Sequence, residues 1–92
     1  IRNTKVSDVY NELIEFGLNV DVYDPVADNK EVLNELGINL IEKIDNVYDG
    51  ILLSVSHNVF KEIDYNKLKI NEKSIIYDLK GFLPRDIVNL RL

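Results

Sequence analysis

The sequence contains no cysteine and a single histidine, His57. Without cysteine there can be no disulfide framework, no thiolate nucleophile and no zinc knuckle. One histidine leaves few ligands for a transition metal. We therefore expect no metal site within these 92 residues.

Long apolar runs and positive charges are also scarce. No apolar stretch approaches the roughly 20 residues that cross a bilayer, and no signal peptide is visible. Eleven lysine and arginine residues stand against 16 aspartate and glutamate residues, giving a formal net charge of −5. This charge argues against nucleic acid or an anionic membrane as a partner, but it does not exclude a local phosphate pocket. We expect a cytoplasmic protein.

The composition that remains is that of an ordinary globular domain. The chain is 46% hydrophobic and 29% charged, which argues against disorder. Its length is near the lower end of what can bury its own core, so we expect one domain over residues 1–92. Because the chain begins at Ile1 rather than at a methionine, we also expect it to be a fragment of a longer polypeptide.

Apolar side chains at helical spacing predict a helix over residues 5–16, which Gly17 ends. A second, short helix is predicted after Asp28 or Asn29 and closed by Gly37. Two further helical segments are predicted, a turn over residues 42–49 and a short helix over 57–64.

Strands are predicted at residues 19–23, 50–55 and 74–78, with a fourth short candidate at 38–41. The continuous apolar run "GILLSV" within them is typical of a parallel strand covered on both faces, and we expect Leu52 and Ile76 to be among the most buried residues. The tail from residue 84 onward is left unassigned.

Strands alternating with helices indicate βαβ crossovers, and hence an α/β fold with a parallel sheet. We expect a three-layer, Rossmann-like sheet with helices on both faces. Such a domain starts with its central strand, whereas this chain starts with a helix. The first, central strand is therefore expected upstream of Ile1.

The segment "IIYDLKGFLPRD", residues 75–86, carries the first candidate site. Lys80 emerges where a buried strand ends, the place where open α/β sheets bind ligands, and Gly81 permits close approach. The alternative is a surface lysine paired with Asp78 or Asp86. We expect Asp78 to orient the loop, since a carboxylate would repel an anionic ligand.

Two other polar positions follow predicted strands. Asp24 could hold ribose hydroxyls, as acidic residues do in dinucleotide-binding domains, but without a glycine-rich loop we interpret Asp24-Pro25 as a turn. Ser56-His57 follows the strand at 50–55. We interpret His57 as a helix cap or a packed loop residue, and a part in shaping a cleft stays open.

Three segments in this order and spacing resemble one family: "RNTKVSDVYNELIEFGLNVDVYDP", "YDGILLSVSHNVFKEID" and "IIYDLKG". Over essentially its whole length the chain resembles the C-terminal domain of the nucleotide-sugar 6-dehydrogenases, the UDP-glucose and GDP-mannose dehydrogenase family. "SVSHNVF" is most similar to the branch that acts on UDP-N-acetylhexosamines.

This resemblance implies an NAD-dependent oxidation of the C6 alcohol of a UDP-sugar to a uronate for polysaccharide biosynthesis. It implies that the chain binds the UDP moiety and works with the N-terminal and central parts of its own enzyme, in a homodimer. The glycine-rich NAD loop and the catalytic cysteine would lie outside this chain, so the fragment alone is expected to be inactive.

The resemblance also implies roles for two residues. Lys80 matches the basic residue that contacts the nucleotide-sugar, and Arg2 matches the arginine that reaches toward the pyrophosphate of NAD. A guanidinium suits that task because its planar fork of donors fits phosphate oxygens.

Two other functions stay open at this point. The chain could be a structural or assembly domain that packs against its parent enzyme without touching a ligand. It also shares features with phosphoacceptor receiver domains, since Ser54 or Ser56 with Lys80 imitates their hydroxyl and lysine pair. A receiver, however, needs an acceptor aspartate at the end of the central strand, and "GILLSV" offers serine there.

Overall fold

The computed structural model describes residues 4–91, and the chain divides into two compact units, residues 1–44 and 45–92. Each unit buries apolar residues of its own. The protein is a small α/β structure with two α-helices and three parallel strands among its described residues. That residues 1–92 act as one domain stays a prediction.

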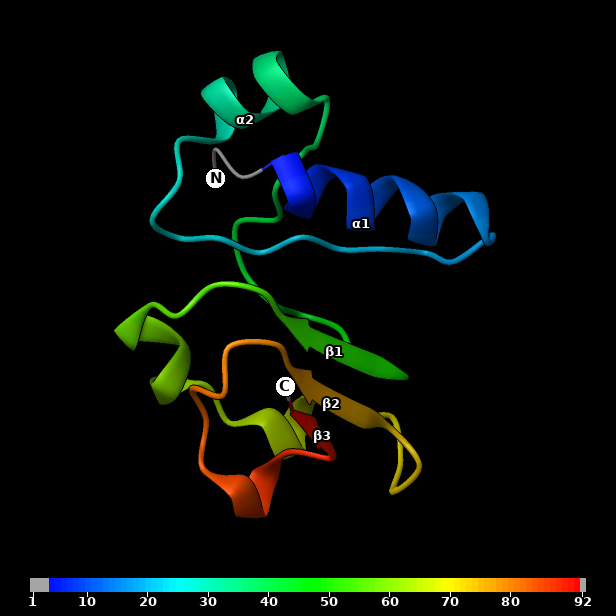
Figure 1. The fold of residues 1–92 in the computed structure, drawn as a ribbon, viewed down its shortest axis with the longest axis vertical. Coiled ribbons are helices and arrows are strands. Elements are labelled where there is room, and N and C mark those ends of the chain that lie inside the picture. Colours follow the sequence, from blue (N-terminus) through cyan, green and yellow to red (C-terminus); the bar gives the residue numbers. More distant parts are fainter. Residues whose placement is uncertain (1–3, 92) are drawn as a thin grey trace. The chain divides into compact units, whose positions relative to one another are not determined.

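The first unit contains the helices α1 (Thr4–Glu15) and α2 (Asn29–Leu36) (Figure 1). α2 begins where predicted, because the Asp28 side chain accepts hydrogen bonds from the backbone N–H groups of Lys30 and Glu31. It ends at Gly37, whose left-handed φ of 69° costs a glycine little. Both predicted ends of this helix are confirmed.

The core of the first unit lies around α2. Val32 from the helix is buried with two residues of the segment that follows it, and neighbouring side chains pack against this group. The members are Val32, Ile38 and Leu40, with Tyr10, Val22, Ala27 and Leu36 partly buried against them. Through Tyr10, α1 is joined to this core.

The strands predicted at residues 19–23 and 38–41 are wrong, because the structure assigns no strand to either segment. The N–H of Ile41 donates a backbone hydrogen bond to the carbonyl of Val22, which links the two segments. The alternating pattern did mark side chains that turn inward, such as Val22 and Leu40. A strand also needs a ladder of hydrogen bonds to a partner, which the alternation alone does not supply.

The second unit holds the sheet, made of β1 (Gly50–Leu53), β2 (Ile75–Asp78) and β3 (Leu90–Arg91) (Figure 1). The strands are parallel in the order β1-β2-β3, so the predicted parallel pairing of 50–55 with 74–78 is confirmed. β3 was not predicted. The connections carry three 3₁₀ helices, η1 (Asn58–Glu62), η2 (Tyr65–Leu68) and η3 (Arg85–Ile87).

Only one face of this sheet is packed within its own unit. Leu53 pairs with Asp78, and Ile51 pairs with Ile76; paired residues point to the same side of a sheet. Leu53, Ile76 and Asp78 are buried, whereas Leu52 on the opposite face is 38% exposed. The expected burial of Ile76 is confirmed, and that of Leu52 is wrong.

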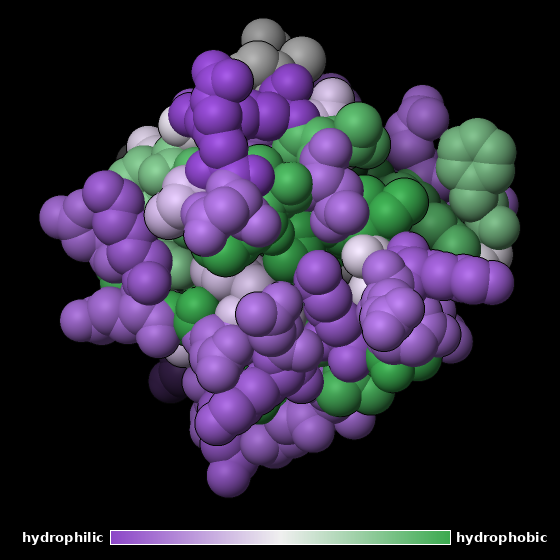
Figure 2. Space-filling model, turned by 90° about the horizontal axis from the view of Figure 1, so that it is seen from below, coloured by the Kyte–Doolittle hydropathy of each residue, from purple (hydrophilic) through white to green (hydrophobic). Residues whose placement is uncertain are grey.

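Apolar side chains consequently reach the surface of the second unit. The exposed ones are Val47, Leu52, Ile70, Ile75 and Leu90. Figure 2 shows apolar groups (green) between hydrophilic side chains on the face that it displays. Because α1 and α2 belong to the other unit, helices on both faces of the sheet stay a prediction.

The helical turn predicted over residues 42–49 is wrong. Tyr48 instead forms an isolated parallel bridge with Lys69. The N–H of Tyr48 donates to the carbonyl of Leu68, and its own carbonyl accepts from the hydroxyl of the buried Ser74. These bonds join the segments that precede β1 and β2. Their partners are 20 or more residues apart in sequence, so a local pattern cannot predict them.

We expect Ile76→Ala to lower the free energy of unfolding of this chain by roughly 2–5 kcal/mol, because it leaves a cavity beneath the central strand. The matched control is Ile75→Ala, at the neighbouring position on the exposed face, which should cost about 1 kcal/mol or less. Urea unfolding followed by circular dichroism would measure both. Equal losses would contradict the assignment of the two faces.

Candidate functional site

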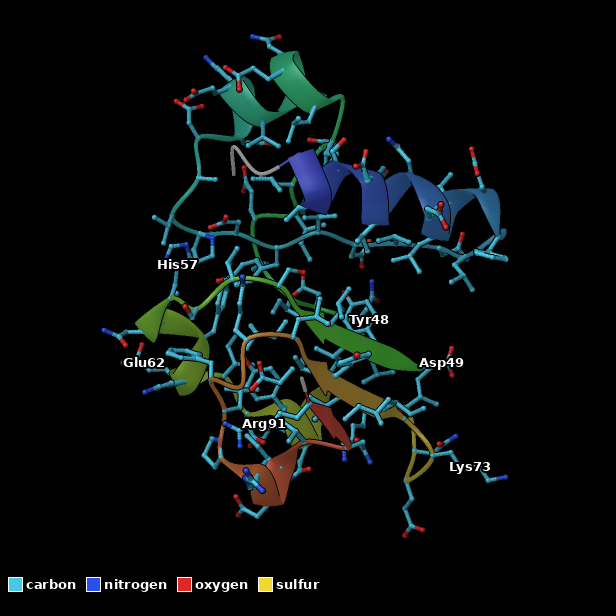
Figure 3. All side chains as sticks on the ribbon, in the orientation of Figure 1. Tyr48, Asp49, His57, Glu62, Lys73 and Arg91 are labelled. Carbon is cyan, nitrogen blue, oxygen red and sulfur yellow. The ribbon has the colours of Figure 1, made fainter. Side chains whose placement is uncertain are left out.

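The candidate site lies beyond the carboxyl ends of the strands, where their connections converge. β1 continues toward η1, β2 continues into the loop of residues 79–83, and β3 ends at Arg91. Figure 3 shows His57 and Glu62 on the connection that follows β1, and shows Asp49 and Lys73 at the opposite, amino ends of the strands. Parallel sheets bind ligands at the carboxyl end, so this is where a site is expected.

A buried carboxylate organises the loop that follows β2. Asp78, the last residue of the strand, is 0% exposed. Its Oδ1 accepts a hydrogen bond from the backbone N–H of Lys80 at 3.0 Å. Its Oδ2 accepts bonds from the N–H groups of Phe82 at 2.6 Å and Leu83 at 2.7 Å. The loop is therefore wrapped around the carboxylate, which supports the expectation that Asp78 orients it.

Asp78 remains ionised despite its burial. Burial by itself would raise the pKa of this carboxyl, because it penalises the charged form. The hydrogen bonds from the Leu83, Lys80 and Phe82 N–H groups and the positive charge of Arg91 outweigh that penalty, and the pKa is lowered. Hydrogen bonds to a charged acceptor are stronger than those between neutral groups, so the carboxylate stabilises the conformation of the loop.

Arg91 fixes the same loop from the neighbouring strand. In the register of β2 with β3, the backbone of Arg91 lies opposite that of Asp78. The Nη2 of Arg91 donates a hydrogen bond to the carbonyl of Gly81. Gly81 has a φ of +60°, and a Cβ there would lie 3.1 Å from the Arg91 guanidinium. Glycine is favoured at this position for its backbone conformation, and a side chain there would require the arginine to shift slightly.

Lys80 lies in this loop, and its side chain is exposed. The three hydrogen bonds that Asp78 accepts come from backbone N–H groups, that of Lys80 among them. The carboxylate is thus used by the backbone of the loop, rather than by the lysine ammonium. That Lys80 contacts a ligand stays a prediction.

The connection after β1 is held by a buried tyrosine. The hydroxyl of Tyr65 donates to the carbonyl of Phe60 at 2.6 Å. Burial, together with the negative charge of Asp78, raises the pKa of Tyr65 to about 12. Tyr65 therefore keeps its proton at neutral pH and serves as a hydrogen-bond donor that shapes η1.

His57 and Asp24 have structural roles. The ring of His57, just before η1, lies tilted against that of Phe60 with centroids 5.8 Å apart, which confirms a packed loop residue. The carboxylate of Asp24 accepts bonds from the N–H groups of Val26 and Ala27, which confirms the turn. A part for His57 in shaping a cleft stays a prediction.

The remaining expectations concern cofactors, metals and membranes. Arg2 lies outside the described residues. Within residues 4–91, no three histidine, aspartate or glutamate side chains gather so that they could hold a metal ion. None of the helices that the structure describes is long and apolar enough to cross a membrane.

Sequence reasoning missed three basic residues near the loop. Lys61, Arg85 and Arg91 line a shallow depression of about 430 Å³ together with residues 81–84. Arg91 could not be placed beside Asp78 while the tail was unassigned. The one usable signal was that "LPRD" and "LRL" bring two arginines into a tail that follows Lys80 closely.

We expect Asp78→Asn to lower the free energy of unfolding by about 1–3 kcal/mol, because the amide cannot accept all three N–H bonds and loses the charge. Since the pKa of Asp78 is lowered in the folded chain, its contribution is present above the unfolded pKa of about 4 and is lost as the pH falls through the folded value. The variant should therefore lose less stability than the wild type on acidification.

Urea unfolding at neutral pH and over a series from pH 6 to about pH 2 would test this expectation. Asp28→Asn is the control, because asparagine caps a helix as well as aspartate does. A variant at Asp78 with unchanged stability and an unchanged acid profile would contradict a central role for this carboxylate.

Comparison with known proteins relates this site to a family. Residues 1–85 match the UDP-binding domain of the UDP-glucose/GDP-mannose dehydrogenase family. This match includes β1, β2, and the loop held by Asp78. No solved structure matches the chain.

Curated relatives extend over the same region. The chain is 38% identical, over its whole length, to a UDP-N-acetyl-D-glucosamine 6-dehydrogenase of Pseudomonas aeruginosa, and 36% identical to one of Salmonella typhi. It is 37% identical over 98% of its length to Protein CapL of Staphylococcus aureus. The chain spans 22% of the length of each of these relatives. It therefore belongs to the UDP-glucose/GDP-mannose dehydrogenase family, of which it is the UDP-binding domain.

Proposed function

We propose that this chain is the C-terminal, nucleotide-binding part of an NAD-dependent dehydrogenase that oxidises the C6 alcohol of a UDP-N-acetylhexosamine to a carboxylate. The observation that carries the proposal is the match of the whole chain to two enzymes named UDP-N-acetyl-D-glucosamine 6-dehydrogenase. The organised loop at the carboxyl end of β2 supports it, since this is the ligand end of a parallel sheet.

In this proposal Lys80 binds the nucleotide-sugar through its ammonium group. Its backbone is fixed by the bond from its N–H to Asp78, while the side chain is exposed and can reach a ligand. A fixed backbone beneath a flexible side chain reduces the entropy that is lost on binding. The chain contributes substrate binding, and the chemical steps take place on residues elsewhere in the enzyme.

The residues of this chain do not make up an NAD site. The sequence has no glycine-rich dinucleotide loop. Asp24, which could have held a ribose, is 7% exposed and accepts bonds from the N–H groups of its own turn. We assign the cofactor to the rest of the enzyme, with Arg2 reaching toward its pyrophosphate as the family pattern implies.

We further propose that the sheet belongs to a three-layer, Rossmann-like domain that is completed by a strand from outside this chain. Among the described strands β1 is an edge, with β2 on one side only. An open edge offers unpaired backbone groups to another strand.

A chain extended upstream by about fifteen residues, enough for a strand and its turn, should have a clearly higher melting temperature than residues 1–92. The reason is that the added strand would satisfy the open backbone groups of β1. Differential scanning calorimetry would compare the two chains. Equal melting temperatures would contradict the missing strand.

In the full-length enzyme, Lys80→Ala should weaken the affinity for UDP-N-acetylglucosamine by about ten- to a hundredfold, the loss of one charge-assisted hydrogen bond. Lys80→Arg should retain part of the affinity, and the affinity for NAD should hardly change. Isothermal titration calorimetry would measure these constants. The control is Lys73→Ala, an exposed lysine at the amino ends of the strands.

Lys80→Ala also distinguishes nucleotide binding from a purely structural or assembly role of the chain. A Lys80→Ala enzyme with normal substrate affinity and a lowered melting temperature would assign the lysine, and its loop, to packing. The exposed apolar side chains of this chain favour such a role, because apolar surface is stabilised when it is buried against other protein. Normal stability with weakened binding would support the nucleotide site.

A further inference from the structure

Arg91 is the last residue of β3, and it contacts the loop that carries Lys80. Its backbone lies opposite that of Asp78 in the register of β2 with β3, so the two side chains leave the same side of the sheet. Figure 3 shows Arg91 on this short strand, near the loop that follows β2. The family match ends at residue 85, so a role for Arg91 has to follow from its contacts.

Asp78 and Arg91 hold opposite kinds of groups in this loop. The carboxylate accepts hydrogen bonds from three backbone N–H groups of residues 80–83. An ionised carboxylate has no donor, so it cannot bind a carbonyl of the loop. The Nη2 of Arg91 does so by donating to the carbonyl of Gly81. The two oppositely charged side chains also attract each other, which keeps both of them at the loop.

These bonds fix the peptide groups on both sides of the Lys80-Gly81 pair. The peptide group before Lys80 is held through its N–H, which donates to Asp78. The carbonyl of the peptide group after Gly81 accepts from Arg91. The N–H of the same group, which belongs to Phe82, donates to Asp78. Because a peptide group is planar, these two contacts on its opposite sides determine its orientation.

Gly81 is the residue at which this loop would otherwise turn most freely. Its φ is +60°, and glycine populates positive and negative φ about equally well. Without the bond from Arg91, the peptide group after Gly81 is held on one side only. The Lys80 ammonium group would then extend from a backbone with more than one orientation. A ligand that needs one of these orientations binds more weakly, in proportion to the fraction of molecules that adopt it.

We propose that Arg91 is a positioning residue for nucleotide-sugar binding: it raises the affinity by holding the backbone of Lys80 in the binding orientation, without contacting the ligand. The inference rests on the proposed role of Lys80 and extends it to a residue of another strand. Because Arg91 acts through Lys80, its effect on affinity should disappear when the lysine ammonium group is absent.

A double-mutant cycle in the full-length enzyme tests this dependence. It compares the wild type, Arg91→Gln, Lys80→Ala and the combined variant by isothermal titration calorimetry with UDP-N-acetylglucosamine. We expect Arg91→Gln alone to raise the Kd by about fivefold or more, which corresponds to a loop that keeps the binding orientation about one fifth of the time or less. In the Lys80→Ala enzyme, the same substitution should change the Kd by less than about twofold.

Hydrogen exchange gives a second readout that needs no ligand. In the ligand-free enzyme, the backbone N–H groups of residues 80–83 should exchange faster in Arg91→Gln than in the wild type, because the loop is no longer held at the Gly81 carbonyl. Arg91→Lys keeps the charge and a donor, and it should restore part of both the protection and the affinity. The control Lys73→Gln loses the same charge at the amino ends of the strands and should change neither.

An equal loss of affinity on Arg91→Gln with and without the Lys80 ammonium group would overturn the inference, because Arg91 would then contact the ligand directly. Weakened binding with unchanged exchange in residues 80–83, or faster exchange with an unchanged Kd, would overturn it as well. If Lys80→Ala still weakens binding, these results leave the proposed function standing. A Lys80→Ala enzyme with wild-type affinity would overturn the role of Lys80 and the inference with it. A full-length protein that binds no UDP-N-acetylglucosamine would overturn the proposed function itself.

Discussion

The interaction on which the site depends is the set of hydrogen bonds that the buried Asp78 carboxylate accepts at the end of the central strand. Burying a charge is costly unless it is fully solvated by the protein. Here three backbone N–H groups replace the water. Because they all come from residues 80–83, the need to solvate one carboxylate dictates the path of the loop.

The consequences of that carboxylate extend to the neighbouring elements. Its charge acts on Arg91, which in turn bonds to Gly81 and occupies the space that a side chain would need there. It also contributes to the raised pKa of Tyr65, whose hydroxyl holds the connection after β1. The buried carboxylate thus orders both the loop after β2 and Arg91, at the carboxyl end of the sheet.

The sheet itself is only half enclosed within its unit. Register places Leu53, Ile76 and Asp78 on a packed face and leaves Leu52 and Ile75 on an exposed one. Apolar side chains that remain in water contribute no burial energy, and they favour association with further protein. This agrees with a chain that spans 22% of its curated relatives' length, in which other segments can supply the cover.

Local chemistry in the sequence determined the ends of α2 and the positions of the two main strands. Asp28 and Gly37 satisfy the ends of α2 through neighbours within a few residues, so their roles can be predicted without a fold. The apolar runs at 50–55 and 74–78 predicted β1 and β2, and the position of Lys80 after the second run placed it at the carboxyl end of β2. The family, too, could be inferred from three segments in order.

Only the tertiary structure determines which of the predicted segments form strands and which basic side chains lie close together. Residues 19–23 alternate as a strand does but have no ladder among the described residues, because hydrogen-bond partners are set by the fold and not by alternation. Leu52 and Leu53 look equivalent in an apolar run, and only the register with β2 puts one inside and the other outside. Lys61, Arg85 and Arg91 are separated by up to 30 positions in sequence, and only the parallel arrangement of the strand ends brings them to one depression.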